Sequence, residues 1–213
     1  MHAAVPPSPR SDALPVVTPE ILSACGQAIR RIRSTHAEAR STGVTSTARS
    51  EGRSTAAVGL TIALVRSLGR QAVLIDLDTD SWTTPAGEGY RGDTPSGPAG
   101  LMDAIEWTNP DLGILRLGRH LEASELTPAR ARSLIAEVLA HGYDVVADLS
   151  CLPPAGSGDQ FAGLFDVVVL VVRAGASSAD AIRGSAQMLA NPPVVLLNRT
   201  HSSIPRWFRY GGR

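Results

Sequence analysis

The segment 44–55, which reads VTSTARSEGRST, has the residue types and spacing of a loop that binds phosphate. In such loops, backbone N–H groups and the positive end of the next helix surround the phosphate. A lysine reaches the β- and γ-phosphates, and a neighbouring hydroxyl holds Mg²⁺. Here Gly52 stands at the glycine before that lysine, whereas Arg53 replaces the lysine itself. The expected phosphate-binding residues are Ser50, Glu51, Gly52, Arg53, Ser54 and Thr55.

Acidic residues end two of the apolar runs that follow this loop. Asp76 and Asp78 close the run VLIDLD, and Asp148 closes a run that begins at Val145. Because the carboxyl ends of parallel strands meet at one edge of a sheet, these acids are expected near the loop. A plainer alternative is that the loop only caps a helix and the acids are turn residues. The order of strand, loop and amphipathic helix favours the site.

Composition limits the classes of function that the chain can have. Its 213 residues suit one domain with a core of its own, and its 20 acidic residues balance its 20 basic ones. Every basic residue is an arginine, and no basic block indicates nucleic-acid binding. The longest apolar run, 167–172, is too short to cross a bilayer, and the N-terminus lacks a signal-peptide pattern. We therefore expect a cytoplasmic protein.

Helical and apolar segments alternate along the chain. Thr18, Pro19 and Glu20 form a helix start signal, and Thr127 with Pro128 forms another. Short continuous apolar runs are typical of strands that are buried on both faces of a parallel sheet. The pattern predicts helices over 19–33, 54–68, 126–140 and 178–189, and strands over 72–75, 114–117, 145–149, 167–172 and 194–197.

These elements predict an α/β fold of the P-loop NTPase type, with a mostly parallel central sheet and helices on both faces. We expect a flexible N-terminal segment over 1–18, a single domain over 19–206 and a C-terminal tail over 207–213. The Gly/Pro-rich segment 82–100 predicts a mobile loop.

The ordered motifs resemble those of the bacterial tyrosine kinases of polysaccharide export. They also resemble, more broadly, the deviant-Walker ATPases that position plasmids and division sites. That family reads roughly VTS-x-x-P-GEGKST at the loop and hhhD-x-D-x-R at the second motif, where this chain has VLIDLDTD. Further matches are GLMDAI at 100–105, YDVVAD at 143–148, VVRAG at 171–175 and LNR at 197–199, so the resemblance spans about 19–206.

The resemblance implies a site for ATP or ADP with Mg²⁺. Ser54, Asp76 and Asp148 would hold the metal ion, and Asp76 or Asp78 would orient the attacking group, with Arg53 supplying positive charge. At the position of Asn198, the family reads the nucleotide base; a turn asparagine is the alternative. The implied partner is the cytoplasmic part of a membrane protein that controls polysaccharide chain length or export. A homo-oligomer is also implied, and no nucleic acid is expected.

Departures from the family pattern bear on activity. Arg53 replaces the lysine, Ser50 replaces a loop glycine, and Tyr210 is the single tyrosine of the tail, where the family carries a cluster. We therefore expect a tyrosine-kinase-like protein of exopolysaccharide or capsule biosynthesis that binds ATP or ADP weakly if at all. If active, it would be an ATP-dependent protein-tyrosine kinase or ATPase. The alternatives are an active positioning ATPase of the ParA or MinD type and a scaffold that binds no nucleotide.

Overall fold

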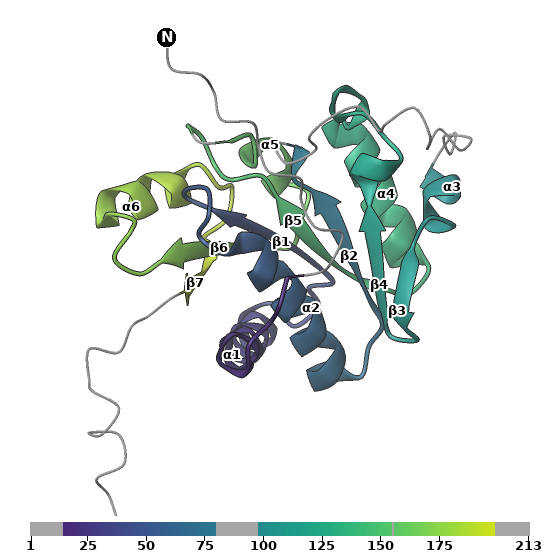
Figure 1. Ribbon diagram of the computed structural model, residues 1–213, viewed down its shortest axis with the longest axis horizontal. Coiled ribbons are helices and arrows are strands. Elements are labelled where there is room, and N and C mark those ends of the chain that lie inside the picture. Colours follow the sequence, from purple (N-terminus) through teal and green to yellow (C-terminus); the bar gives the residue numbers. More distant parts are fainter. Residues whose placement is uncertain (1–14, 80–97, 155, 199–213) are drawn as a thin grey trace, which may run out of the picture.

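A seven-stranded sheet forms the centre of the molecule, with the strand order β3-β4-β2-β5-β1-β6-β7 (Figure 1). The computed structural model describes residues 15–79, 98–154 and 156–198, so Tyr210, the predicted tail and residues 82–97 of the predicted loop lie outside them. Every strand pairing is parallel except that of β3 with β4, which is antiparallel. The strands are β1 (Ser41–Ser46), β2 (Ala72–Leu77), β3 (Glu106–Asn109), β4 (Leu112–Arg116), β5 (Asp144–Leu149), β6 (Val167–Arg173) and β7 (Val194–Asn198).

The longer helices begin within two residues of the predicted starts. The hydroxyls of Thr18 and Thr127 cap the first turns of two helices whose first residue is a proline. Gly69 ends α2 in the left-handed conformation. The helices are α1 (Pro19–Thr35), α2 (Arg53–Leu68), α3 (Pro98–Met102), α4 (Pro128–Ala140), α5 (Asp159–Ala162) and α6 (Ala179–Gln187), with 3₁₀ turns at Leu117–Arg119 and Ala123–Glu125.

The two faces of the sheet carry separate hydrophobic cores. On one face α1 and α2 cover Leu74 of β2 and Val146 of β5. On the other face α4 and α5 cover Val73 and Val145. Because side chains alternate across a strand, the even-numbered residues of β2 and β5 face α2. The predicted fold class, a mostly parallel sheet with helices on both faces, is confirmed.

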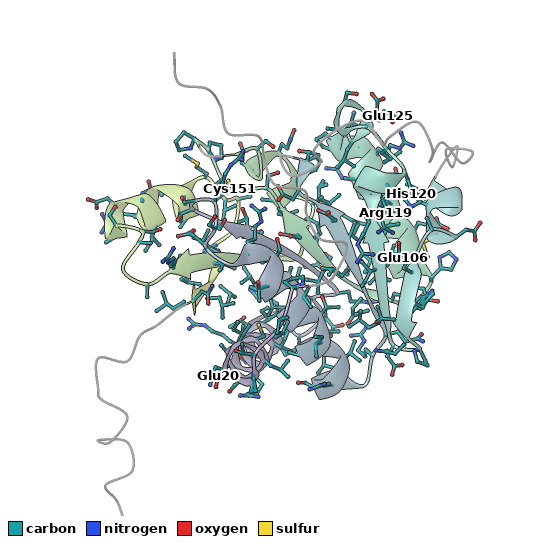
Figure 2. All side chains as sticks on the ribbon, in the orientation of Figure 1. Glu20, Glu106, Arg119, His120, Glu125 and Cys151 are labelled. Carbon is teal, nitrogen blue, oxygen red and sulfur yellow. The ribbon has the colours of Figure 1, made fainter. Side chains whose placement is uncertain are left out.

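Strand β3 is an edge strand that the sequence pattern does not predict. All four of its residues are exposed, so it lacks the apolar run that marks the other strands. Its first residue, Glu106, pairs with both Arg116 and Arg119. Figure 2 labels Glu106 and Arg119 in this part of the molecule. The predicted strand over 114–117 is longer at its start, since β4 begins at Leu112.

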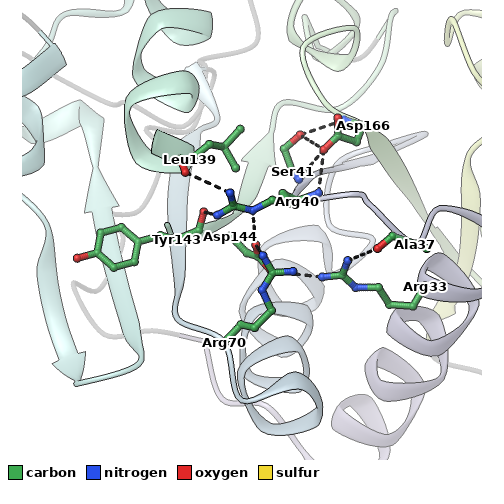
Figure 3. A network of polar contacts seen from close by, with 9 residues as sticks. All are labelled: Arg33, Ala37, Arg40, Ser41, Arg70, Leu139, Tyr143, Asp144 and Asp166. Carbon is green, nitrogen blue, oxygen red and sulfur yellow. Dashed lines mark hydrogen bonds and ion pairs between the residues drawn. The ribbon is translucent and has the colours of Figure 1, made fainter. Parts of the chain in front are cut away.

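At the amino-terminal ends of the parallel strands, a buried carboxylate holds three elements together (Figure 3). Asp144, the fully buried first residue of β5, pairs with Arg33 from the end of α1 at 3.3 Å. It also pairs with Arg40, just before β1, at 3.1 Å and with Arg70, just after α2, at 2.9 Å. One aspartate thus joins the ends of α1 and α2 to the start of β1.

No helix in the described part of the chain is both long and apolar enough to cross a membrane.

Candidate nucleotide site

The predicted phosphate loop is a tight turn between β1 and α2. Two of its residues have positive φ angles, Ser50 at 62° and Gly52 at 88°. A β-carbon on Gly52 would lie 2.1 Å from Nδ2 of Asn198, so this position requires glycine for two reasons. Ser50 adopts the left-handed backbone conformation at the position where the resembled family has glycine, a conformation that glycine adopts more readily. The predicted segment therefore forms a tight turn, and its contact with a phosphate stays a prediction.

Glu51 fills the first part of this loop with its own carboxylate. Its Oε2 accepts the backbone N–H groups of Thr47 at 2.9 Å and Ala48 at 3.0 Å, and the Thr47 hydroxyl at 2.8 Å. Its Oε1 accepts the N–H of Arg173 at 3.2 Å and the hydroxyl of Ser177. Burial raises the pKa of Glu51, but these hydrogen bonds together outweigh burial and leave the pKa below its ordinary value. The charged carboxylate thus fastens the loop to the end of β6.

Asn198, at the end of β7, also contacts the loop. Its Nδ2 donates a hydrogen bond of 2.7 Å to the backbone oxygen of Glu51. The side chain is half-buried and supports the turn at Gly52 from the side of β7. This contact gives Asn198 a structural role in the loop, and its predicted contact with a nucleotide base stays a prediction.

The three predicted aspartates lie together at the carboxyl edge of the sheet. Asp76 of β2 is directly opposite Asp148 of β5 in the parallel register. Both have even numbers, so the strand alternation directs them toward α2. Asp78 follows the end of β2, and its carboxylate contacts Arg53 at the start of α2. The N–H of Asp78 donates to Oδ1 of Asp76 at 3.1 Å, and the Ser150 hydroxyl donates to Oδ1 of Asp78 at 2.9 Å. The structure therefore places the carboxylates beside the loop as the sequence predicts.

Arg53, the first residue of α2, turns its side chain toward these carboxylates. Its Nε donates to Oδ1 of Asp148 at 2.8 Å, and its Nη2 donates to Oδ2 of Asp78. Only 11% of the Arg53 side chain is exposed, against 3% for Asp78 and 9% for Asp148. A planar guanidinium can bridge two carboxylates in this way, whereas the single ammonium of a lysine would have to share one point charge.

The environment keeps Arg53 charged. Burial lowers its pKa, but the charges of Asp148 and Asp78 outweigh burial and raise the pKa above its ordinary value. Burial raises the pKa of Asp148, although Arg53 and a hydrogen bond from Ser54 act in the opposite direction. Asp148 therefore becomes protonated at a higher pH than an ordinary aspartate, and that protonation would weaken its pair with Arg53.

The start of α2 has backbone N–H groups that could bind an anion. Gly52 caps the helix without a side chain, and the first intrahelical bond is from the N–H of Ala56 to the oxygen of Gly52. The N–H groups of Arg53, Ser54 and Thr55 therefore have no acceptor inside the helix. A helix start of this kind favours a negative group through its dipole.

The donor set does not fit a bound Mg²⁺ as the side chains are arranged. Mg²⁺ prefers an octahedral shell of oxygen ligands, usually with one or two carboxylates. Here Asp78 and Asp148 are engaged by Arg53, and the Ser54 hydroxyl is bonded to Asp148. Within the described residues, no group of three acidic, histidine or cysteine side chains is placed to hold a metal ion.

The structure thus brings every predicted site residue into one region, but it adds contacts that the sequence does not indicate. Thr47, Ser150 and Ser177 hold the side chains of Glu51 and Asp78. Hydroxyl residues in loops carry no spacing signal for such contacts. The burial of Glu51, which is 2% exposed, is the feature that identifies its role, and burial becomes visible only in three dimensions.

Comparison with solved structures places this site in a known fold. The VpsO kinase domain aligns over 85% of this chain and 97% of its own, with 21% identity and a TM-score of 0.60. The kinase domain of the Escherichia coli tyrosine kinase ETK aligns over 84% of this chain and 79% of its own, with 15% identity and a TM-score of 0.59. A ParA family ATPase from Chlorobium tepidum aligns over 76% of each chain, with 18% identity and a TM-score of 0.50.

No protein-family model and no curated protein sequence matches the chain. The alignments with solved structures show that the chain has the fold of bacterial tyrosine kinase domains and ParA-type P-loop ATPases, as its motifs predict.

Proposed function

We propose that this protein is a tyrosine-kinase-like P-loop protein of exopolysaccharide or capsule biosynthesis that binds ATP or ADP weakly. The observation that carries the proposal is the loop at the start of α2, which faces Asp78 and Asp148 on the fold of bacterial tyrosine kinase domains. The N-terminal end of α2 supplies the N–H groups that a phosphate requires.

The local charges explain why binding would be weak. The positive charge of Arg53 is shared between two buried carboxylates, those of Asp78 and Asp148, so it is not available to a phosphate. Arg53 is the residue that would have to replace the loop lysine, and it is already bonded to two of these carboxylates. A polyphosphate would have to draw Arg53 away from them, which costs part of the binding free energy. Phosphoryl transfer depends on positioned positive charge, so turnover is reduced further.

The test is a titration of ADP and ATP into the wild type and Arg53→Lys by calorimetry. A lysine keeps the charge but cannot bridge Asp78 and Asp148, so its ammonium is released toward the phosphates. We expect nucleotide to bind Arg53→Lys at least about tenfold more tightly than the wild type. Arg49→Lys is the matched control, because Arg49 is an exposed arginine of the same loop, and its affinity should equal that of the wild type. Absence of binding to all three proteins would refute the nucleotide site.

The proposed partner is the cytoplasmic part of a membrane protein that controls polysaccharide chain length or export. It would bring this cytoplasmic protein to the inner membrane, and this chain would regulate it in turn. Co-precipitation with the cytoplasmic segment of a chain-length protein encoded nearby tests this part. If the pair does not form at micromolar concentrations, the partner proposal fails even where nucleotide binds.

Two other functions have an observation in their favour. The ParA family likeness supports a positioning ATPase, which would show partner-stimulated ATP hydrolysis that Asp76→Ala abolishes. The ion pairs of Arg53 and the hydrogen bonds of Glu51 support a scaffold that keeps its loop folded without nucleotide. A scaffold would show no thermal shift with ADP or ATP at millimolar concentration, and neither would Arg53→Lys.

A further inference from the structure

The carboxylates of Asp78 and Asp148 already have a cation between them. Nη2 of Arg53 contacts Oδ2 of Asp78, and Nε contacts Oδ1 of Asp148 at 2.8 Å. The two acids come from neighbouring parallel strands, and Arg53 comes from the helix that covers them. The guanidinium therefore lies between groups that could otherwise share a metal ion.

The remaining contacts leave these carboxylates little capacity for a second cation. The other oxygen of Asp78 accepts the Ser150 hydroxyl at 2.9 Å, and Asp148 also accepts from Ser54. The side chains of Asp78, Asp148 and Arg53 are 3%, 9% and 11% exposed, so all three charged groups are largely buried. A divalent ion would have to lose its own water, displace the guanidinium and leave that guanidinium buried without a partner.

We propose that Arg53 is the resident cation of this edge of the sheet: it takes the place of a divalent metal ion between Asp78 and Asp148, and the wild-type site binds no such ion. Whether or not a nucleotide binds, these ion pairs decide which cation the two acids hold. Removal of the guanidinium leaves two buried carboxylates without the cation that lies between them. Such a pair of carboxylates is then a site for a hard divalent cation.

Binding of Mn²⁺ alone, without nucleotide, tests the proposal. Electron paramagnetic resonance measures the free Mn²⁺, and the melting temperature reports binding to the folded protein. We compare the wild type, Asp148→Asn, Arg53→Ala and the double variant Arg53→Ala with Asp148→Asn. The wild type and Asp148→Asn should show the same weak background. Arg53→Ala should bind Mn²⁺ at least about tenfold more tightly than the wild type and should melt higher when Mn²⁺ is added.

The double variant separates this site from other acids on the surface. It should lose the Mn²⁺ affinity that Arg53→Ala gains, because Asp148 is one of the two proposed ligands. If Arg53→Ala does not fold, Arg53→Gln keeps most of the side-chain volume without the charge and serves in its place. The proposal is overturned if the wild type binds Mn²⁺ in a way that Asp148→Asn abolishes. It is also overturned if a folded Arg53 variant gains no Mn²⁺ affinity.

The Mg²⁺ dependence of ADP binding provides a second test, which does not depend on the Mn²⁺ titration. If ADP binds, its affinity for the wild type should be the same with excess Mg²⁺ and with a chelator. In Arg53→Gln it should become tighter with Mg²⁺. Strict dependence of the wild type on Mg²⁺ would overturn the proposal, whereas complete absence of ADP binding would refute the nucleotide site and leave the Mn²⁺ result to decide.

Discussion

Asp144→Asn should destabilise the fold more than the loss of any other single charge at the amino-terminal ends of the strands. The carboxylate of Asp144 is completely buried and pairs with Arg33, Arg40 and Arg70 at 2.9–3.3 Å (Figure 3). Asparagine has nearly the same shape but no charge, so the substitution leaves three guanidinium groups around a neutral amide. The ends of α1 and α2 and the start of β1 would then lose the charge that holds them together.

The magnitude follows from the burial of the partners. Removal of one member of a fully buried ion pair costs about 3–5 kcal/mol, because the other charge stays buried without compensation. Here the three arginine side chains are 19%, 34% and 37% exposed, so water recovers part of this cost. We therefore expect a loss of about 2–3 kcal/mol, below the range for a fully buried pair. For a chain of this size, that loss lowers the melting temperature by about 4–12 °C.

Urea unfolding followed by circular dichroism measures this change in the free energy of unfolding. Asp180→Asn is the matched control, because Asp180 pairs with Arg183 on the surface, where the two side chains are 88% and 68% exposed. The control should change the free energy of unfolding by less than about 0.5 kcal/mol. Arg70→Gln removes only the most exposed of the three partners and should cost less than about 1 kcal/mol. If Asp144→Asn costs no more than Asp180→Asn, the buried carboxylate does not hold these elements together.

Three further perturbations test particular contacts. Gly52→Ala should lower the free energy of unfolding by about 2 kcal/mol, because the φ of Gly52 is 88° and the new β-carbon would meet Asn198. Gly69→Ala, with φ 61° and open space around the new β-carbon, should cost about 1 kcal/mol. Equal losses in urea unfolding would contradict the contact with Asn198. Burial raises the pKa of Cys25 to about 12, so this thiol should not react with Ellman's reagent in the native protein at pH 8; rapid labelling at Cys25 in a peptide map would contradict its burial. Burial raises the pKa of Asp166, but hydrogen bonds from the start of β1 outweigh burial and hold the pKa below its ordinary 3.8. A lowered folded-state pKa stabilises the protein at a pH above the unfolded value and ceases to do so as the pH falls through the folded value. Stability should therefore fall below about pH 4, less steeply in Asp166→Asn, and equal slopes for both proteins would refute the contribution.

The fold could be predicted because its signals are local. Helix starts at Thr18 and Thr127 and the continuous apolar runs of β5 and β6 follow from capping and burial on both faces. Strand β3 could not be predicted, because it pairs through its backbone at an exposed edge and its side chains carry no apolar pattern. Pairing of this kind depends on the neighbouring strand, which the local sequence does not specify.

The candidate site could be predicted in its membership but not in its internal contacts. Spacing along the chain placed Arg53, Asp78 and Asp148 in one region, because loop and strand ends meet at one edge of the sheet. The direction of the Arg53 side chain could not be predicted, because the choice between a phosphate and two carboxylates depends on distances across three elements. For the same reason the sequence did not indicate that Glu51 holds the loop with its own carboxylate.

The bridge made by Arg53 also constrains how the protein can change over generations. A lineage that first exchanges Arg53 for a neutral residue inherits two facing buried carboxylates with no cation between them. A lineage that first replaces Asp78 or Asp148 keeps one ion pair and meets a smaller penalty at that step. Inherited substitutions at these three positions are therefore expected to occur in a preferred order, with an acid replaced before the arginine.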